Sequence, residues 1–75
     1  KVYPNPSSGS LTIDNLQQRR FTLTITDLTG KVIYREQIDG RKQVQLDVNA
    51  SAGTYLLTAI DEQGQFFRQR IQLLR

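Results

Sequence analysis

The side chains that most often perform chemistry in proteins are scarce in this chain of 75 residues. It contains no cysteine and no histidine, so the usual thiol nucleophile, the usual general base and the usual transition-metal ligands are missing. Serines and carboxylates are present, but without histidine, cysteine or a paired-glutamate arrangement they do not indicate a hydrolase site. We therefore expect no enzyme activity, no metal site and no cofactor.

The charged side chains are mainly basic, with ten lysines and arginines against seven acidic residues and a net charge of +3. The basic residues are spread along the chain as Arg19-Arg20, Arg41-Lys42, Arg68, Arg70 and Arg75. A nucleic-acid-binding protein usually gathers such charge into one stripe with exposed aromatic residues, so we expect a solvated surface and no nucleic-acid partner. No apolar run approaches the roughly 20 residues that cross a membrane, so no transmembrane segment is expected.

The apolar residues alternate with polar ones at the period of β-strands. Strands are predicted near residues 11–13, 21–26, 31–38, 44–48, 55–60 and 65–74. The clearest is 21–26, where Phe21, Leu23 and Ile25 share one face and three threonines share the other. In residues 31–38 both faces carry apolar groups, so the inward face is left undecided. A chain of this length makes one domain, expected to span residues 1–75.

Turn residues separate these strands at regular intervals. Asp27-Leu28-Thr29-Gly30 and Asp61-Glu62-Gln63-Gly64 share the spacing Asp-x-x-Gly. The aspartate of such a turn accepts hydrogen bonds from backbone N–H groups, and the glycine closes a type I hairpin with a bulge. Asp39-Gly40 is typical of a two-residue type I′ hairpin turn. We therefore expect Gly30, Gly40 and Gly64 to be structural turn residues.

Six or seven short strands joined by such turns predict an all-β fold. A sandwich of two packed sheets is favoured, because a single sheet would leave residues such as Tyr34, Phe66 and Phe67 in water. A small barrel is the alternative architecture.

Two motifs stand out between the strands. Tyr3-Pro4-Asn5-Pro6-Ser7-Ser8-Gly9 is extended and stiff because each proline fixes its own φ and restricts the residue before it. Taken alone, it is a rigid turn in which Gly9 bends the chain into the next strand. Gly53-Thr54-Tyr55 follows a polar loop and begins an apolar strand. Taken alone, it is a loop glycine before a core tyrosine whose hydroxyl finds a backbone partner.

The order of the motifs is more specific than any one of them. Five features follow one another along the chain. They are Tyr-Pro-Asn-Pro with a glycine three residues on, Asp-Leu-Thr-Gly-Lys-Val-Ile-Tyr, Gly-Thr-Tyr, a second Asp-x-x-Gly and a basic final strand. From Val2 to Leu74 the chain resembles the type A C-terminal sorting domain of the type IX (Por) secretion system. The resemblance implies an Ig-like β-sandwich of about seven short, mostly antiparallel strands.

The resemblance also assigns roles to individual residues. Its sorting motifs fall on Pro4, Asn5, Pro6, Gly9, Gly53 and Tyr55. The family tends to carry spaced lysines along its last strand, where this chain has Arg68, Arg70 and Arg75. Arginine keeps the positive charge but offers a planar, multidentate group in place of a point charge. This strand is the candidate receptor-facing surface.

The resemblance further implies a route for the parent protein. Such domains belong to longer secreted proteins of Bacteroidota, which enter the periplasm by an N-terminal signal peptide that this stretch does not contain. The outer-membrane type IX machinery then recognises the domain and exports the cargo to the outer membrane, the cell surface or the exterior. A sortase-like protease cuts the domain off, at a site upstream of Lys1 or near it, and many cargos are joined to an anionic lipopolysaccharide.

A physical mechanism for recognition follows from the final strand. If residues 65–74 form a sheet edge with Arg68 and Arg70 on one face, a receptor strand can pair with it. The plainer interpretation is an ordinary edge strand protected by its charge. The alternative function is a non-catalytic Ig-like or fibronectin-III-like accessory or spacer module. A carbohydrate-binding module is disfavoured, because alternation places Phe66 and Phe67 on opposite faces.

Overall fold

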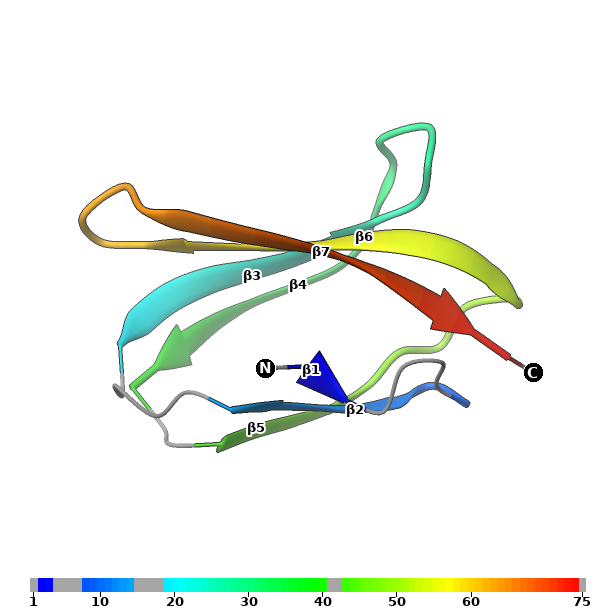
Figure 1. Cartoon of the computed structure of the whole chain (residues 1–75), viewed down its shortest axis with the longest axis horizontal. Coiled ribbons are helices and arrows are strands. Elements are labelled where there is room, and N and C mark those ends of the chain that lie inside the picture. The colour runs from blue at the N-terminus through cyan, green and yellow to red at the C-terminus, as the bar shows by residue number, and fades with distance from the viewer. Residues whose placement is uncertain (1, 4–7, 15–18, 41–42, 75) are drawn as a thin grey trace.

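The chain is built from β-strands, as its alternating pattern predicts. The computed structural model describes residues 2–3, 8–14, 19–40 and 43–74 (Figure 1). The strands are β1 (Val2–Tyr3), β2 (Ser10–Asp14), β3 (Arg20–Thr26), β4 (Val32–Asp39), β5 (Gln43–Asp47), β6 (Gly53–Asp61) and β7 (Phe66–Leu73). No helix that could cross a membrane occurs in these ranges. The expected all-β class is confirmed.

The strands form two sheets that lie one above the other (Figure 1). One has the order β1-β2-β5 and the other the order β4-β3-β6-β7, with every described pair antiparallel. Lettered in chain order as A, B, C, C′, E, F and G, the sheets are A-B-E and C′-C-F-G, an Ig-like arrangement. Among the described strands none pairs across the two sheets, so the sandwich is confirmed and the small barrel is not formed.

The expected hairpin at Asp39-Gly40 is wrong. β4 ends at Asp39 and pairs with β3, whereas β5 begins at Gln43 and pairs with β2 in the other sheet. Gly40 does adopt a positive φ of +95°, so the dipeptide correctly indicates the local backbone conformation. The strand partner is decided instead by burial, because β5 places its apolar residues in the core from the layer opposite β4.

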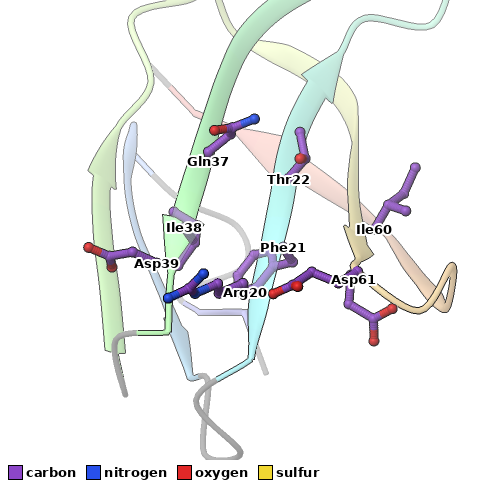
Figure 2. A pocket seen from close by; sticks show the side chains of 9 residues that line it. Arg20, Phe21, Thr22, Gln37, Ile38, Asp39, Ile60 and Asp61 are labelled. Atoms are coloured by element: carbon purple, nitrogen blue, oxygen red, sulfur yellow. The ribbon is translucent and has the colours of Figure 1, made fainter.

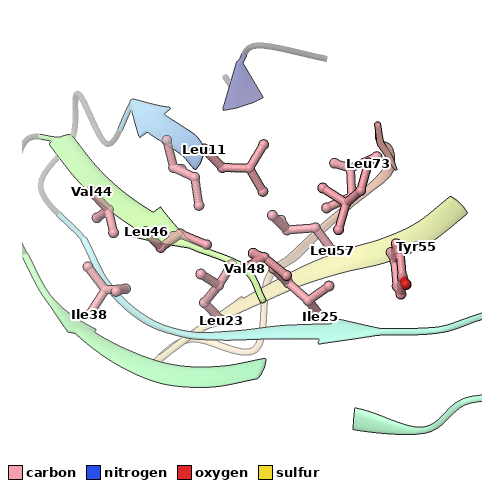
Figure 3. Packing of buried hydrophobic residues seen from close by; sticks show 12 residues of the cluster. Leu11, Leu23, Ile25, Ile38, Val44, Leu46, Val48, Tyr55, Leu57 and Leu73 are labelled. Carbon is pink, nitrogen blue, oxygen red and sulfur yellow. The ribbon is translucent and has the colours of Figure 1, made fainter. Parts of the chain in front are cut away.

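Inward-facing residues of both sheets form one core (Figure 3). Leu23 and Ile25 of β3 and Leu57 of β6 are fully buried, and they point towards Leu46 and Val48 of the other layer. The other buried members of the cluster are Leu11, Ile13, Ile38, Val44, Tyr55, Ile71 and Leu73. The alternation of the strands therefore supplies the core directly, as expected for a sandwich.

The undecided face of residues 31–38 is resolved by strand pairing. Tyr34, Glu36 and Ile38 lie opposite inward-facing residues of β3, so they share the core side of β4. The Tyr34 hydroxyl donates a hydrogen bond of 2.5 Å to the Glu36 carboxylate at this partly buried edge.

The two aromatic residues of β7 are less covered than the sequence predicts. Phe66 is 65% exposed and Phe67 is 44% exposed. The expectation that a second sheet would bury Phe66 is wrong, because Phe66 shares the outer face of β7 with Arg68. Phe67 does face the other sheet, but at the end of the sandwich where cover is incomplete.

The first Asp-x-x-Gly turn joins β3 to β4 and has the predicted geometry. Asp27 Oδ1 accepts hydrogen bonds from the backbone N–H of Thr29 (2.9 Å) and of Lys31 (3.0 Å). The Thr29 hydroxyl donates a third bond to the same oxygen at 2.6 Å. Gly30, at φ +94°, donates its N–H to the Asp27 carbonyl at 3.1 Å. Gly30 therefore closes the β3–β4 turn with a positive φ.

The second turn joins β6 to β7 and repeats this geometry at the opposite end of the sheet (Figure 1). Asp61 Oδ1 accepts from the backbone N–H of Gln63 and of Gln65, each at 2.9 Å. Gly64, at φ +83°, donates its N–H to the Asp61 carbonyl at 3.2 Å. Asp61 Oδ2 also receives Arg19 Nη1 at 3.0 Å, an ion pair that the local turn pattern does not predict.

These bonds shift the pKa of both aspartates in the same direction. The Thr29 hydroxyl and the Lys31 N–H lower the pKa of Asp27. At Asp61 partial desolvation raises the pKa, but the bonds from Arg19 and from the Gln65 and Gln63 N–H groups outweigh it and leave the pKa lowered. A carboxylate with a lowered pKa in the folded state stabilises the fold above its unfolded pKa, and this stabilisation is lost as the pH falls through the folded value.

We therefore expect the free energy of unfolding to decrease as the pH falls below about 4, the ordinary range for an aspartate. The double variant Asp27→Asn/Asp61→Asn keeps a side-chain oxygen for each turn but cannot titrate. Its unfolding free energy, measured by urea denaturation from pH 7 to pH 2, should depend less on pH than that of the original chain. Parallel profiles for the two proteins would contradict the role given to these carboxylates.

Candidate functional site

The described parts of both predicted sorting motifs lie at the same end of the sandwich (Figure 1). Gly9 is buried, and its carbonyl accepts the Val48 N–H at 2.7 Å, which extends the β2–β5 pairing beyond Ser10. Val48 is followed by the short loop that leads to Gly53 and Tyr55. The same end of the molecule holds the start of β6 and the end of β7 (Figure 1). Pro4, Asn5 and Pro6 lie outside the described residues.

Tyr55 is a core residue that also fastens this loop. Its side chain is only 7% exposed, and its hydroxyl donates a hydrogen bond to the Ser51 carbonyl at 2.6 Å. Gly53 has a φ of +155°, which a residue with a side chain rarely adopts, and a Cβ there would lie 3.8 Å from Tyr55 Cε1. The core tyrosine with a backbone partner that the sequence predicts is therefore present. The Tyr55 ring is therefore largely covered.

The basic final strand lies at the edge of its sheet, as predicted. β7 pairs with β6 on one side, and none of the described strands pairs with its other side. Arg68 and Arg70 are exposed on the outer face of β7, opposite Thr58 and Leu56 of β6. The Arg68 guanidinium lies 5.6 Å from the centre of the Phe66 ring, a cation–π arrangement. Arg75 lies outside the described residues.

A shallow hollow lies on the outer face of the four-stranded sheet. Figure 2 shows Thr22 and Gln37 side by side on β3 and β4, with Ile60 on β6. The hollow has a volume of about 420 Å³. Arg20, Asp39 and Asp61 lie along its lower margin in Figure 2, and Glu62 also lines it. Within the described ranges no group of three acidic side chains is placed to hold a metal ion. What these residues offer is hydrogen bonding and charge.

A second exposed group lies beside the β6–β7 turn, and sequence patterns missed it. Arg19 binds Asp61 as described and also donates Nη1 to Gln65 Oε1 at 3.1 Å. Phe66 and Phe67 stand next to this pair. No local signal connects Arg19 with a residue 42 positions away. The alternation does place the two phenylalanines on opposite faces, but it does not show that both remain exposed.

The strand order and the two packed layers define a small Ig-like β-sandwich domain. The chain belongs to the family of secretion system C-terminal sorting domains, because the sequence model of that family matches residues 1–72. This family is the sorting signal of the type IX secretion system, which delivers proteins to the cell surface or the exterior. The resemblance to this family that was inferred from the ordered motifs is therefore confirmed at the level of the family.

Two known proteins contain a segment similar to this chain. An endo-acting ulvan lyase of Formosa agariphila is 28% identical over 72 residues, which cover 95% of this chain and 14% of that enzyme. In Porphyromonas gingivalis, PorZ, an essential surface component of the type IX secretion system, matches the whole chain with a TM-score of 0.80. The identity with PorZ is 24% over 11% of its chain, so that likeness supports the fold alone. This chain thus spans a small fraction of each protein.

Proposed function

We propose that the type IX machinery recognises this sorting domain by adding a strand to the edge of β7 with which no described strand pairs. The observation that carries the proposal is that β7 ends its sheet among the described strands and has Arg68 and Arg70 on its outer face. An extended segment that pairs with such an edge gains affinity from main-chain hydrogen bonds, whatever its sequence. The side chains along the edge then determine which segment is accepted.

The charge of β7 favours this use over simple protection of an edge. From Gln65 to Arg75 the sequence holds three arginines and no acidic residue. An arginine guanidinium can bind a carboxylate with two parallel hydrogen bonds, which fixes the orientation of a partner. Complementary charge also accelerates encounter and excludes the wrong partners.

The remaining parts of the proposal concern the parent protein. We propose that residues 1–75 are one non-catalytic, type A domain of a longer secreted protein, which passes through the periplasm. A sortase-like protease would remove the domain and join the cargo to an anionic lipopolysaccharide. The similarity to part of an ulvan lyase supports an enzyme as one possible type of cargo.

A spacer or accessory module is the competing function. It would keep the same core but would have no need of a recognised edge, so substitutions on β7 would leave export unchanged. Deleting residues 72–75 does not separate these functions cleanly, because Leu73 is fully buried and its loss would destabilise the fold.

A charge reversal on β7 separates them. Residues 1–75 would be fused behind a reporter with a signal peptide in a bacterium that has type IX secretion. We expect Arg68→Glu/Arg70→Glu to reduce the exported reporter at least about tenfold, because like charges at an interface cost several kcal/mol. The free energy of unfolding should change by no more than about 0.5 kcal/mol, since both side chains are exposed.

The matched control is Arg20→Glu/Arg35→Glu, which makes the same change in net charge. Both of these arginines are exposed on the other half of the same sheet. This control should export at the original level. Equal losses in the two double variants would show an effect of net charge alone, and normal export of the β7 variant would refute recognition at this edge.

A further inference from the structure

Large apolar side chains remain exposed where β7 begins. Ile60 of β6 and Phe66 of β7 are directly opposite each other on the outer face of the sheet, and both are about half exposed or more. Phe67 points to the inner face from the neighbouring position. Two phenylalanines therefore lie on opposite faces of β7, the last described strand of its sheet. We call Phe66 and Phe67 the aromatic pair.

The inner member of the pair, Phe67, borders a hollow beside β7 that is lined by both apolar and polar side chains. A space of about 430 Å³ is lined by both phenylalanines together with Phe21, Ala59 and the Arg19–Asp61 ion pair. A narrower space of about 150 Å³ shares Phe21, Ala59 and Phe67 and is lined further in by core residues of both sheets. The hollow is large enough to receive an apolar side chain of a partner.

We propose that the aromatic pair is the anchor for the strand that the sorting machinery adds to β7, which rests on the function proposed above. The partner segment is an extended strand with large apolar side chains on both faces near one end. One of these packs on Phe66 and Ile60, and the other enters the hollow beside Phe67. Acidic side chains further along its outer face meet Arg68 and Arg70.

Strand geometry determines the order of apolar and acidic side chains along the partner strand. A strand added to an edge alternates its side chains between the two faces in step with the strand beside it. The partner must therefore match an aromatic residue on each face at positions 66 and 67, and a positive charge on the outer face at positions 68 and 70. The cation–π contact holds the Arg68 guanidinium next to the Phe66 ring, so the apolar and charged contacts are adjacent.

A second copy of this chain is a poorer occupant of the edge. Antiparallel pairing of two β7 strands would bring the arginines of one copy close to those of the other, with no acidic residue on either strand. Like charges directly opposite each other destabilise a strand pair. An acidic, apolar strand of the machinery satisfies both the aromatic pair and the arginines.

The test is Phe66→Ser in the reporter fusion, with Leu28→Ser as the matched control. Leu28 is 66% exposed, like Phe66, but it lies in the β3–β4 turn at the opposite end of the sheet. We expect Phe66→Ser to reduce the exported reporter at least about fivefold, as the loss of a central aromatic anchor does at interfaces. Its midpoint of urea unfolding should match the original chain, and Leu28→Ser should export normally.

The outcomes separate this inference from the proposed function. Normal export of Phe66→Ser together with loss in Arg68→Glu/Arg70→Glu overturns the aromatic anchor and leaves recognition at β7 standing. Normal export of both variants overturns the two together, and an equal loss in Leu28→Ser also overturns the anchor. If the purified chain forms dimers that Phe66→Ser dissociates, the occupant is a second copy and the inference is wrong. Loss in the two β7 variants alone, with a monomeric chain, supports it.

Discussion

Replacing Leu57 by alanine is expected to lower the free energy of unfolding by about 2–5 kcal/mol. Leu57 lies in the middle of β6, is fully buried and is opposite Ile25 of β3. Its truncation removes apolar contacts in the middle of the core and leaves a cavity between the sheets. A domain of this size has a total stability of roughly 5–10 kcal/mol, so a substantial part would be lost.

Urea denaturation followed by circular dichroism measures this change. Leu28→Ala is the control, because it removes the same atoms from a side chain that is 66% exposed. Its unfolding free energy should remain within about 0.5 kcal/mol of the original value. Similar losses at both positions would contradict the two-layer core described above.

Much of this fold could be predicted from short-range patterns. Alternation in residues 21–26 indicated a half-buried strand, and β3 covers Arg20–Thr26 with Leu23 and Ile25 buried. The Asp-x-x-Gly spacing indicated two hairpins, and both form. These features depend on residues close together in the sequence, where the physical preferences of turns and strands act directly.

The errors come from features that depend on distant residues. Asp39-Gly40 indicates a local backbone conformation, but the partner of β5 is chosen by the packing of its apolar face against the opposite layer. The ion pair between Arg19 and Asp61 joins residues that only the folded sheet brings together. The exposure of Phe66 depends likewise on where the second sheet stops covering the first, which periodicity does not contain.

The contacts of the two sorting motifs differ in how far they could be predicted, because one is local in sequence and the other is not. The hydroxyl partner of Tyr55 lies only four residues away at Ser51, so the corner could be predicted from sequence. The hydrogen bond from the Val48 N–H to the Gly9 carbonyl could not be predicted, although it ties the first motif to the segment that leads to Gly53. The described motif residues thus hold one end of the sandwich together, whereas the exposed residues of β7 and the aromatic pair present a surface. We infer that the motifs preserve the fold that displays this surface.

Substitutions at Tyr55 test this division of roles. Tyr55→Ala should lower the free energy of unfolding by about 3–5 kcal/mol, as the loss of a buried aromatic side chain does. Tyr55→Phe keeps the ring and removes only the hydrogen bond to the Ser51 carbonyl, so we expect a loss of about 0.5–1.5 kcal/mol. Urea denaturation of the three proteins measures both changes.

Export then distinguishes a structural tyrosine from a recognised one. Ile25→Val is the matched variant, because Ile25 is fully buried and its truncation should also cost about 0.5–1.5 kcal/mol. If Tyr55 acts through the fold, Tyr55→Phe and Ile25→Val export the reporter equally well at equal stability. A selective export defect in Tyr55→Phe would show that the hydroxyl or its loop is contacted by the machinery. The 7% exposure of the Tyr55 side chain favours the first result, since a partner would have to open the corner to reach it.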